Sequence, residues 1–163
     1  MSKLWYVAYG SNLLPTNVAR YLGSTPPDVT SLFRLPYERY FAGESARWDG
    51  GVAFLSLYRS FKGCRGRGYL VTEDQFDQLF CGENRVTGMS VAEDVWALEP
   101  GNRHVHDMPE FAENPCVGKY NAVLRLDDTN GVPAATITTA RVLPRRAPED
   151  TYLRAIKAGE RIS

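Results

Sequence analysis

The fold is decided by a short stretch near the amino terminus, WYVAYGSNL at residues 5–13. Residues 5–9 are aromatic, apolar or β-branched and too few for a helix, so they predict a buried strand. Gly10 lets the backbone turn where a Cβ would interfere. Pro15 suits a first helical turn, and apolar residues recur at helical spacing until Gly23, so a short helix is expected over residues 14–22.

The loop between this strand and this helix is the first candidate for a binding site. Amide N–H groups at the start of a helix have no intrahelical acceptor, so those of Gly10, Ser11, Asn12 and Leu13 can point into one small volume. Such a cradle suits a carboxylate or a developing oxyanion. The stretch has neither the further glycines of a dinucleotide-binding loop nor the Gly-Lys-Ser/Thr of a P-loop, so it does not support nucleotide phosphate binding. An ordinary strand-to-helix turn is the alternative.

Composition and charge exclude several classes of protein. A chain of 163 residues with 44% hydrophobic content is long enough for one domain, expected to span residues 1–163. Nineteen basic and nineteen acidic residues are mixed along the chain, which argues against nucleic acid or an anionic membrane as a partner. The first residues match neither a signal peptide nor a membrane span of ~20 apolar residues, so we expect a cytoplasmic protein.

The cysteines and histidines favour neither a disulfide framework nor a metal site. Cys64, Cys81 and Cys116 are odd in number and far apart, with no Cys-x-x-Cys, and are expected to be buried thiols. His104 and His106 alternate as two positions on one strand face, and Cys116 would complete a set of three ligands. No fourth ligand or ligand-spacing motif accompanies them, so we expect no metal.

The rest of the sequence predicts mostly extended structure. Strands are expected at residues 29–41 with an interruption at Pro36, and at 52–58, 65–71, 94–98, 117–126 and 134–143, the last two joined in a hairpin through the turn DDTNG at 127–131. A looser segment at residues 43–51 precedes the second of these strands, and its adjacent glycines Gly50 and Gly51 permit close backbone approach.

Two further helices are expected. Thr72 and Gln75 make a capping box, the apolar stripe that follows is buried, and Gly82 is predicted to end that helix, which places Glu83 immediately outside it. Pro148 opens a last helix that is predicted to stop at Gly159. Many strands with three short helices predict an α+β domain, built on a curved, mainly antiparallel sheet or a small β-barrel.

The opening run YVAYGSNL at residues 6–13 resembles the signature of the γ-glutamylcyclotransferase-like family, whose members begin with a Tyr-Gly-Ser-Asn segment in the substrate pocket. Three later landmarks agree in order: WDGGVA at 48–53, the run from GYLV at 68–71 to QLFCGE at 78–83, and Pro148 with YLRAIKAG at 152–159. Together they span residues 5–159. The chain departs from the family at two positions. Relatives often have a small residue where this chain has Asn84, and a tyrosine near the position of Ser90.

The resemblance implies a fold, a reaction and a site. The fold would be γ-glutamylcyclotransferase-like, and the enzyme, an acyltransferase or lyase, would release 5-oxoproline from a small γ-glutamyl substrate without a cofactor. Glu83 occupies the place of the family's catalytic acid/base. The substrate-binding positions would be Tyr9, Gly10, Ser11, Asn12, Gly51 and Tyr152.

This reaction sets requirements that the residues can be compared with. The substrate's own α-amine attacks its γ-carbonyl and expels the attached amine, so one carboxylate can remove the first proton and return it to the leaving group. Partial burial should raise the pKa of Glu83 toward neutrality. Glu44, in another glycine-containing loop, is the rival carboxylate. Tyr152 either donates a phenol hydrogen bond to the substrate or packs under the sheet.

Two other functions are compatible with the same residues. One is a non-catalytic module that binds a small carboxylate ligand in the same pocket. The other is an enzyme acting on a different γ-glutamyl amine, such as one from secondary metabolism or polyamine breakdown. The sequence leaves open which amine is released. It is compatible with a monomer or a homodimer, and exposed strand edges can support a dimer.

Overall fold

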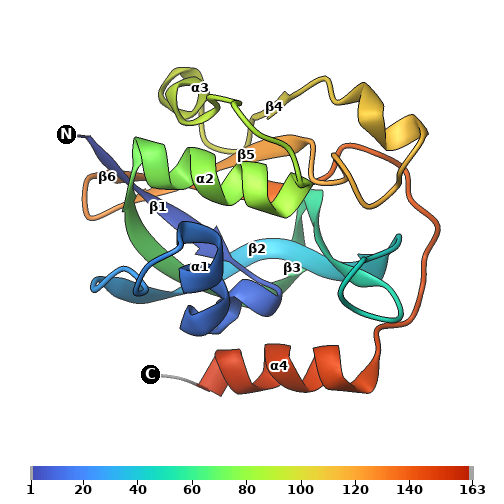
Figure 1. The fold of residues 1–163 in the computed structure, drawn as a ribbon. Coiled ribbons are helices and arrows are strands. Elements are labelled where there is room, and N and C mark those ends of the chain that lie inside the picture. The colour runs from blue at the N-terminus through green and yellow to red at the C-terminus, as the bar shows by residue number, and fades with distance from the viewer. Residues whose placement is uncertain (1, 162–163) are drawn as a thin grey trace.

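The computed structural model describes residues 2–161 of the chain. Its six strands are β1 (Lys3–Ala8), β2 (Thr30–Ala42), β3 (Val52–Thr72), β4 (Arg103–Val105), β5 (Ala122–Thr129) and β6 (Val132–Thr138). The helices are α1 (Pro15–Leu22), α2 (Glu73–Asn84), α3 (Ala92–Ala97) and α4 (Asp150–Arg161), with 3₁₀ turns η1 (Ser11–Leu13) and η2 (Pro109–Ala112). Figure 1 shows α2 and α3 on one side of the molecule and α4 on the opposite side.

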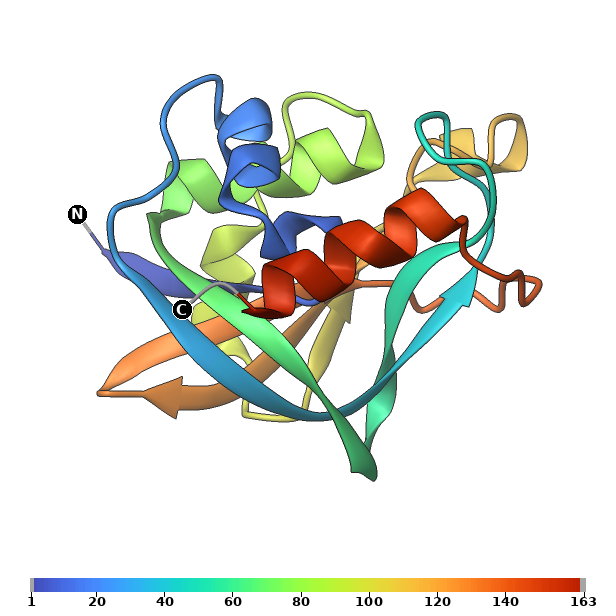
Figure 2. The same cartoon turned by 90° about the horizontal axis from the view of Figure 1, so that it is seen from below.

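The strands form one curved sheet in the order β2-β3-β1-β6-β5-β4. The strand β1, which the opening stretch predicts, lies inside it, antiparallel to β3 and parallel to β6, and every other pairing is antiparallel. The sheet stays open, with β2 and β4 at its edges (Figure 2). The expectation of a curved, mainly antiparallel sheet is therefore confirmed, whereas the alternative of a closed barrel is not realised.

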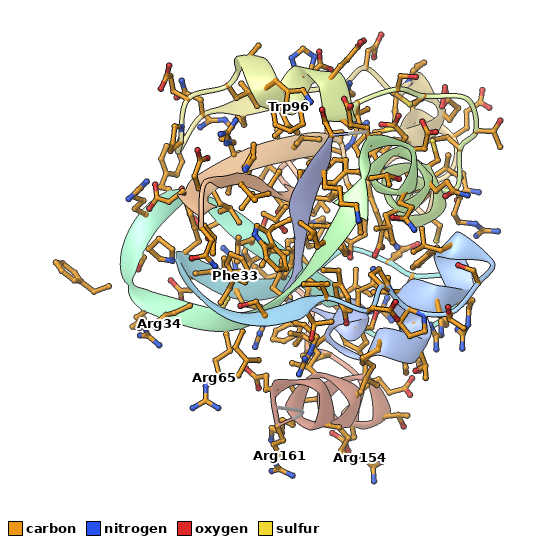
Figure 3. The ribbon with its side chains drawn as sticks, turned by 90° about the vertical axis from the view of Figure 1, so that its left-hand side faces the viewer. Phe33, Arg34, Arg65, Trp96, Arg154 and Arg161 are labelled. Atoms are coloured by element: carbon orange, nitrogen blue, oxygen red, sulfur yellow. The ribbon has the colours of Figure 1, made fainter. Side chains whose placement is uncertain are left out.

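The first helix and the last one pack on the loop that follows β1. The helix α1 ends at Gly23 in the left-handed conformation, with φ of 63°, as the sequence predicts. The helix α4 contacts η1 and β3, as Figure 2 shows. Arg154 and Arg161 of α4 point away from the molecule in Figure 3, whereas Tyr152 and Ile156 on its inner face are buried. This amphipathic packing fixes α4 against the η1 loop.

The strand β2 lies one residue later than predicted, and β3 is longer than predicted. The strand β2 is unbroken, so the expected interruption at Pro36 is not realised. Its register against β3 instead shifts between Leu35 and Tyr37 and again between Tyr37 and Arg39, and an edge strand tolerates the missing N–H of Pro36. The strand β3 runs unbroken from Val52 to Thr72, so the prediction of two separate strands there is wrong. The strand β3 pairs with β2 on both sides of its polar middle, from Val52 to Arg59 and from Cys64 to Tyr69, and no local sequence pattern reports this pairing.

The helix α2 begins as predicted and ends later. Thr72 Oγ1 accepts a hydrogen bond from the Gln75 N–H at 3.2 Å, and Gln75 Oε1 accepts from the Thr72 N–H at 2.9 Å, which confirms the capping box. The helix continues through Gly82 to Asn84, and Arg85 takes the left-handed position with φ of 56°. Glu83 therefore lies inside the last turn, and the prediction that places it outside is wrong.

Gly82 serves helix packing instead of helix termination. A Cβ at this position would clash with the ring of Tyr21 on α1. The glycine thus allows α1 and α2 to approach closely. A glycine needed for close approach and a glycine needed for a left-handed cap look the same in a sequence.

The helix α3 replaces the strand predicted at residues 94–98. The Asp77 carboxylate on α2 accepts hydrogen bonds from the Val91 and Ala92 N–H groups, each at 2.8 Å, and so caps α3 from outside the segment. This contact is tertiary and overrides the local β-propensity. The described residues thus contain four α-helices where three were predicted.

The hairpin and the last helix follow the prediction with shifted ends, whereas the short strand β4 was not among the predicted strands. The hairpin is confirmed: β5 pairs with β6, and Asn130 and Gly131 at its tip have positive φ of 53° and 75°. The strand β5 begins at Ala122 instead of residue 117. The helix α4 passes Gly159 and reaches Arg161, so the predicted stop is wrong.

The buried apolar residues form one cluster that includes β1, β3, α2, β5, β6 and α4. The three cysteines have free thiols and are half-buried, so the expectation of buried thiols is only partly met. Among the described residues, no helix is long and apolar enough to cross a membrane.

Candidate active site

Two adjoining cavities lie where the η1 loop, the end of α2 and the start of α4 meet. The outer cavity has a volume of about 350 Å³, and the inner one has about 30 Å³. Ser11, Glu83, Tyr120 and Tyr152 line both. Because these four side chains stand between the two spaces, a ligand that occupies both must pass them.

Glu83 reaches this boundary from the last turn of α2. Asn12 Nδ2 donates a hydrogen bond of 2.5 Å to Glu83 Oε1. Burial raises the pKa of the Glu83 carboxyl to about 7, while the charge of Lys119, the bond from Asn12 and the charge of Arg47 each lower it. The net effect is a carboxyl that gains and loses a proton near neutral pH, as a general acid/base requires.

Asn12 is the residue that positions this carboxylate. Its side chain is buried, and Nδ2 also donates to the Tyr6 hydroxyl at 2.9 Å. The Tyr69 hydroxyl donates to the backbone carbonyl of Asn12 at 2.8 Å. Two tyrosines from adjacent strands therefore hold the asparagine, and the asparagine holds the carboxylate.

The η1 loop has fewer open donors than the sequence suggests. The Leu13 N–H donates to the Gly10 carbonyl at 3.0 Å, so at most three of the four predicted N–H groups remain for a ligand. Asn17 Nδ2 donates to the Ser11 carbonyl at 2.7 Å and fixes the loop from α1. A Cβ on Gly10 would lie 3.2 Å from Tyr152 Oη, which explains why a glycine suits this position.

Tyr152 brings a hydroxyl to the same place from α4. Its Oη accepts a hydrogen bond from the Ala53 N–H at 2.9 Å. Since that bond uses the oxygen as an acceptor, the hydroxyl proton is left to be donated in another direction. The ring packs against Trp48 with centroids 5.0 Å apart, so the two alternatives for Tyr152, pocket donor and packed aromatic, are both realised.

Tyr9 plays a different part. Its hydroxyl donates to the Ile137 carbonyl at 2.7 Å and is used within the fold, whereas its side chain lines the inner cavity. Tyr9 thus shapes the inner cavity and offers no free hydroxyl proton there.

Three cationic side chains line the outer cavity: Arg47, Arg85 and Lys119. Lys119 Nζ donates to the Glu44 carbonyl at 2.8 Å, and burial lowers the pKa of this ammonium. The Arg47 guanidinium lies 4.7 Å from the centre of the Trp48 ring. Sequence reasoning missed these residues because they come from three separate segments and share no motif.

Solved structures resemble this arrangement of elements. A gamma-glutamyl cyclotransferase superposes with a TM-score of 0.58 at 16% identity, over 97% of this chain and 78% of that one. A human protein, loc79017, gives 0.57 at 17% identity, over 98% of this chain and 79% of that one. The chain has the γ-glutamyl cyclotransferase-like fold. YkqA from Bacillus subtilis gives a TM-score of 0.55 at 17% identity, over 98% of this chain and 48% of that one.

The sequence by itself matches no protein-family model and no curated protein. At 16–17% identity, the likeness to the solved structures establishes the γ-glutamyl cyclotransferase-like fold and leaves the chemistry to the residues of this chain.

Within this fold, two of the candidate residues lie away from both cavities. Gly51 borders neither of them, and a Cβ there would clash with the carbonyl oxygen of Arg146, so this glycine permits two backbone segments to touch. Glu44 is exposed and lines a separate hollow with Phe111 and Leu143.

The departure at Asn84 has a structural explanation. Asn84 is fully buried, and its Nδ2 donates to the carbonyls of Phe80 and Tyr120, at 3.0 and 2.9 Å. Its Oδ1 accepts from the Tyr120 N–H at 2.8 Å. Asn84 thus fastens the segment that carries Lys119 to the end of α2. Ser90 is exposed and lines neither cavity.

Proposed function

We propose that the protein is a γ-glutamyl cyclotransferase that releases 5-oxoproline from a small γ-glutamyl compound. One observation carries this proposal: the Glu83 carboxyl, with a pKa of about 7, stands between the two cavities of a γ-glutamyl cyclotransferase-like fold. No cofactor takes part in the proposed reaction.

In the proposed mechanism, Glu83 acts first as a base and then as an acid. It removes a proton from the substrate's α-ammonium, and the freed amine attacks the γ-carbonyl carbon to close a five-membered ring. The carbon–nitrogen bond to the leaving amine then breaks as Glu83 returns the proton to that amine. The ring nitrogen still carries one extra proton after its attack, and the Glu83 carboxylate takes up this second proton, which leaves a neutral lactam. From Glu83 the second proton passes on to the departing amine or to water. Holding both reacting groups in one pose supplies the proximity that this ring closure needs.

The donors around the inner cavity support this mechanism. The carbonyl oxygen becomes an oxyanion while the ring closes, and the backbone N–H groups of the η1 loop and the Tyr152 hydroxyl are the donors available to it. The inner cavity, of about 30 Å³, has room for the reacting end of a substrate only. The bulk of the substrate would occupy the outer cavity.

The charge of the outer cavity favours one kind of leaving group. Arg47, Arg85 and Lys119 line it against a single carboxylate, Glu83. We therefore propose a leaving amine that carries a carboxylate, such as an amino acid or a short peptide, because a cationic polyamine would meet repulsion there.

The test is a panel of γ-glutamyl compounds incubated with the purified protein. The panel pairs γ-glutamyl-alanine with γ-glutamyl-ethylamine, which lacks the carboxylate, and adds γ-glutamyl-putrescine and glutathione. We expect 5-oxoproline from γ-glutamyl-alanine or glutathione and much less from the two amines. Release of free glutamate instead would indicate hydrolysis and contradict cyclotransfer.

The competing function is a module that binds a small carboxylate ligand without reaction. Such a protein would show a ligand-induced rise in Tm with these compounds and form no 5-oxoproline. The ionisable group at Glu83 favours the enzyme, because binding alone requires no carboxyl that titrates near neutral pH.

A further inference from the structure

A second cluster of reactive side chains lies outside both cavities, where α3 meets β4. The Nε2 atoms of His104 and His106 lie 4.0 and 3.9 Å from the same oxygen, Oδ2 of Asp94. The three possible ligand atoms all lie within 4.8 Å of one another. The sequence suggests Cys116 as the third partner of these histidines, but Cys116 lines the outer cavity, and Asp94 takes its place.

His106 supplies an independent observation. Its side chain is 9% exposed, and its Nε2 has no hydrogen-bond partner in the described part of the chain. A buried polar atom without a partner is rare and needs an explanation, of which a bound ion is one. The imidazoles of His104 and His106 are 4.4 Å apart between ring centres, and the three ligand atoms lie within 4.8 Å of one another, so they converge on one small volume.

The backbone that carries the histidines is well anchored. His104 pairs with Val123 in the ladder between β4 and β5, and the His106 N–H extends that ladder by donating to the Asn121 carbonyl at 2.8 Å. Alternate residues of a strand point to one face, which sets both imidazoles on the side of α3.

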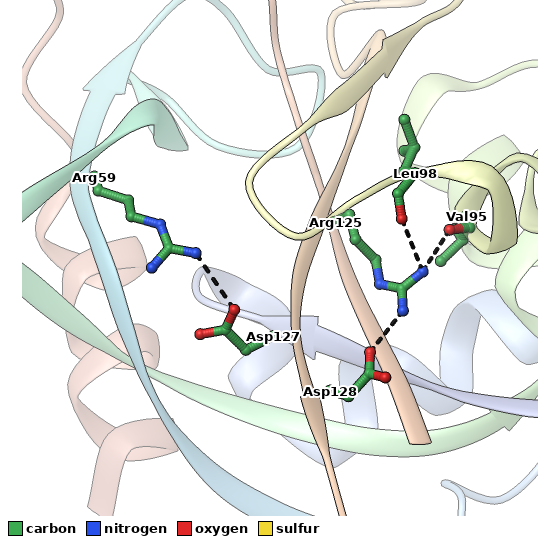
Figure 4. A network of polar contacts seen from close by, with 6 residues as sticks. All are labelled: Arg59, Val95, Leu98, Arg125, Asp127 and Asp128. Atoms are coloured by element: carbon green, nitrogen blue, oxygen red, sulfur yellow. Dashed lines mark hydrogen bonds and ion pairs between the residues drawn. The ribbon is translucent and has the colours of Figure 1, made fainter. Parts of the chain in front are cut away.

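The helix that carries Asp94 is held at both ends. Asp77 caps its start, as described above. At its end, the buried Arg125 of β5 donates from Nη1 to the carbonyls of Val95 and Leu98, at 2.6 and 3.3 Å, and from Nη2 to Asp128 at 2.6 Å (Figure 4). The three side chains therefore converge from elements whose positions other contacts fix.

We propose that Asp94, His104 and His106 form a site for a divalent transition-metal ion of the Zn²⁺ class. Imidazole nitrogen and carboxylate oxygen are ordinary Zn²⁺ ligands at ~2.0–2.2 Å, so two such atoms at a tetrahedral angle lie roughly 3.3 Å apart. The separations of 3.9 and 4.0 Å exceed this by about 0.6–0.7 Å, and the two histidine nitrogens lie within 4.8 Å of each other, so rotations of the side chains would bring the three ligand atoms onto one ion. The exposed side of His104 leaves a position for water.

The bound ion would fasten α3 to the edge strand β4. Three residues of β4 pair with β5, and the ion would add a side-chain link from this short edge strand to α3. An ion that binds the folded state alone at 100 times its Kd multiplies the folding equilibrium constant about 100-fold. Zn²⁺ should therefore raise the Tm by several degrees.

The test is calorimetric titration of EDTA-dialysed protein with Zn²⁺, together with Tm measured with and without the ion. We expect one equivalent to bind to the wild type and the Tm to rise. Asp94→Asn and His104→Ala change partly exposed side chains and should fold, and each should weaken binding at least 10-fold and abolish the rise in Tm. His106 is left intact because its ring packs on Phe80, 5.2 Å between centres.

Two matched variants serve as controls. Glu93→Gln removes the neighbouring carboxylate on α3, and Cys116→Ser removes the thiol, so both should bind Zn²⁺ as the wild type does. Absence of binding to the wild type, equal affinity in Asp94→Asn and His104→Ala, or loss of binding in Cys116→Ser would each overturn the proposal. The readouts are independent of 5-oxoproline, so this site and the proposed catalytic activity stand or fall separately.

Discussion

At the scale of single residues, the proposed function depends on the carboxyl of Glu83. Burial raises the pKa of Glu83 to about 7, and the hydrogen bond from Asn12 opposes that rise. The family resemblance singled out this residue and led to the expectation of a raised pKa, whereas its place after the helix stripe alone did not distinguish it from the other carboxylates. Its partner contact with Asn12, 71 positions away, was not predictable, because no local pattern reports which loop a helix end will meet.

The raised pKa predicts how stability depends on pH. The unfolded chain loses the Glu83 proton near its ordinary pKa of 4.5, whereas the folded protein keeps it to about 7, so the free energy of unfolding falls as pH rises between these values. The fall contributed by this group is at most roughly 3 kcal/mol. The variant Glu83→Gln cannot ionise at this position, so the Tm of the variant minus that of the wild type should increase from pH 5 to pH 8. Parallel Tm curves over that range would show that the pKa is not raised.

Asn12→Ala tests how far the hydrogen bond from Asn12 lowers the pKa of Glu83. The Asn12 bond lowers the pKa of Glu83, so its removal should raise that pKa further and move the acidic limb of kcat/KM to higher pH. The pH–rate profile measures this directly. Ser11→Ala is the matched control: it alters the neighbouring side chain but keeps the backbone donors, so its limb should not move.

At the scale of elements, the sequence predicted the starts of helices better than their ends. Proline at a first turn and the Thr72 capping box are local signals, and both hold in the structure. Gly82 and Gly159 looked like stops but are positions of close helix approach, toward Tyr21 and Leu13. The helix α3 was missed because its cap, Asp77, belongs to another element.

Gly159→Ala should disturb the candidate active site although Gly159 lines neither cavity. A Cβ there would clash with Leu13 in η1, so α4 would shift away from the loop that faces Tyr152. We expect a lower Tm and a lower kcat/KM, although alanine is the better helix former by about 1 kcal/mol. The control is Ala158→Gly at the exposed neighbouring position, which should cost some stability and leave kcat/KM unchanged. A fully active, more stable Gly159→Ala protein would contradict this packing.

Asn84→Ala tests the tie between α2 and the segment that carries Lys119. The change leaves the N–H and the carbonyl of Tyr120 without their buried partners, at a cost of about 1–3 kcal/mol for each group left unsatisfied. Urea denaturation should show a loss of roughly 2–6 kcal/mol. Asn114→Ala, in an exposed loop, is the control and should cost less than about 1 kcal/mol. Equal losses in the two variants would count against the tie.

At the scale of the whole molecule, the sequence predicted the class of fold and the curved sheet but not its connectivity. The parallel pairing of β1 with β6 joins segments about 130 residues apart, and only the fold as a whole brings them together. The same holds for the cations of the outer cavity and for the Asp94, His104 and His106 cluster, each assembled from separate segments. Local patterns predict elements, whereas sites that several elements build appear only in three dimensions.

The central claim is that Glu83 performs proton transfer in a cyclotransfer reaction. The most direct measurement is 5-oxoproline formation from γ-glutamyl-alanine by the wild type, Glu83→Gln and Glu44→Gln, each verified as folded by circular dichroism. We predict that Glu83→Gln lowers kcat by about 10²–10⁴-fold, the usual contribution of a positioned acid/base, while Glu44→Gln stays near the wild type. Full turnover by folded Glu83→Gln would contradict the account.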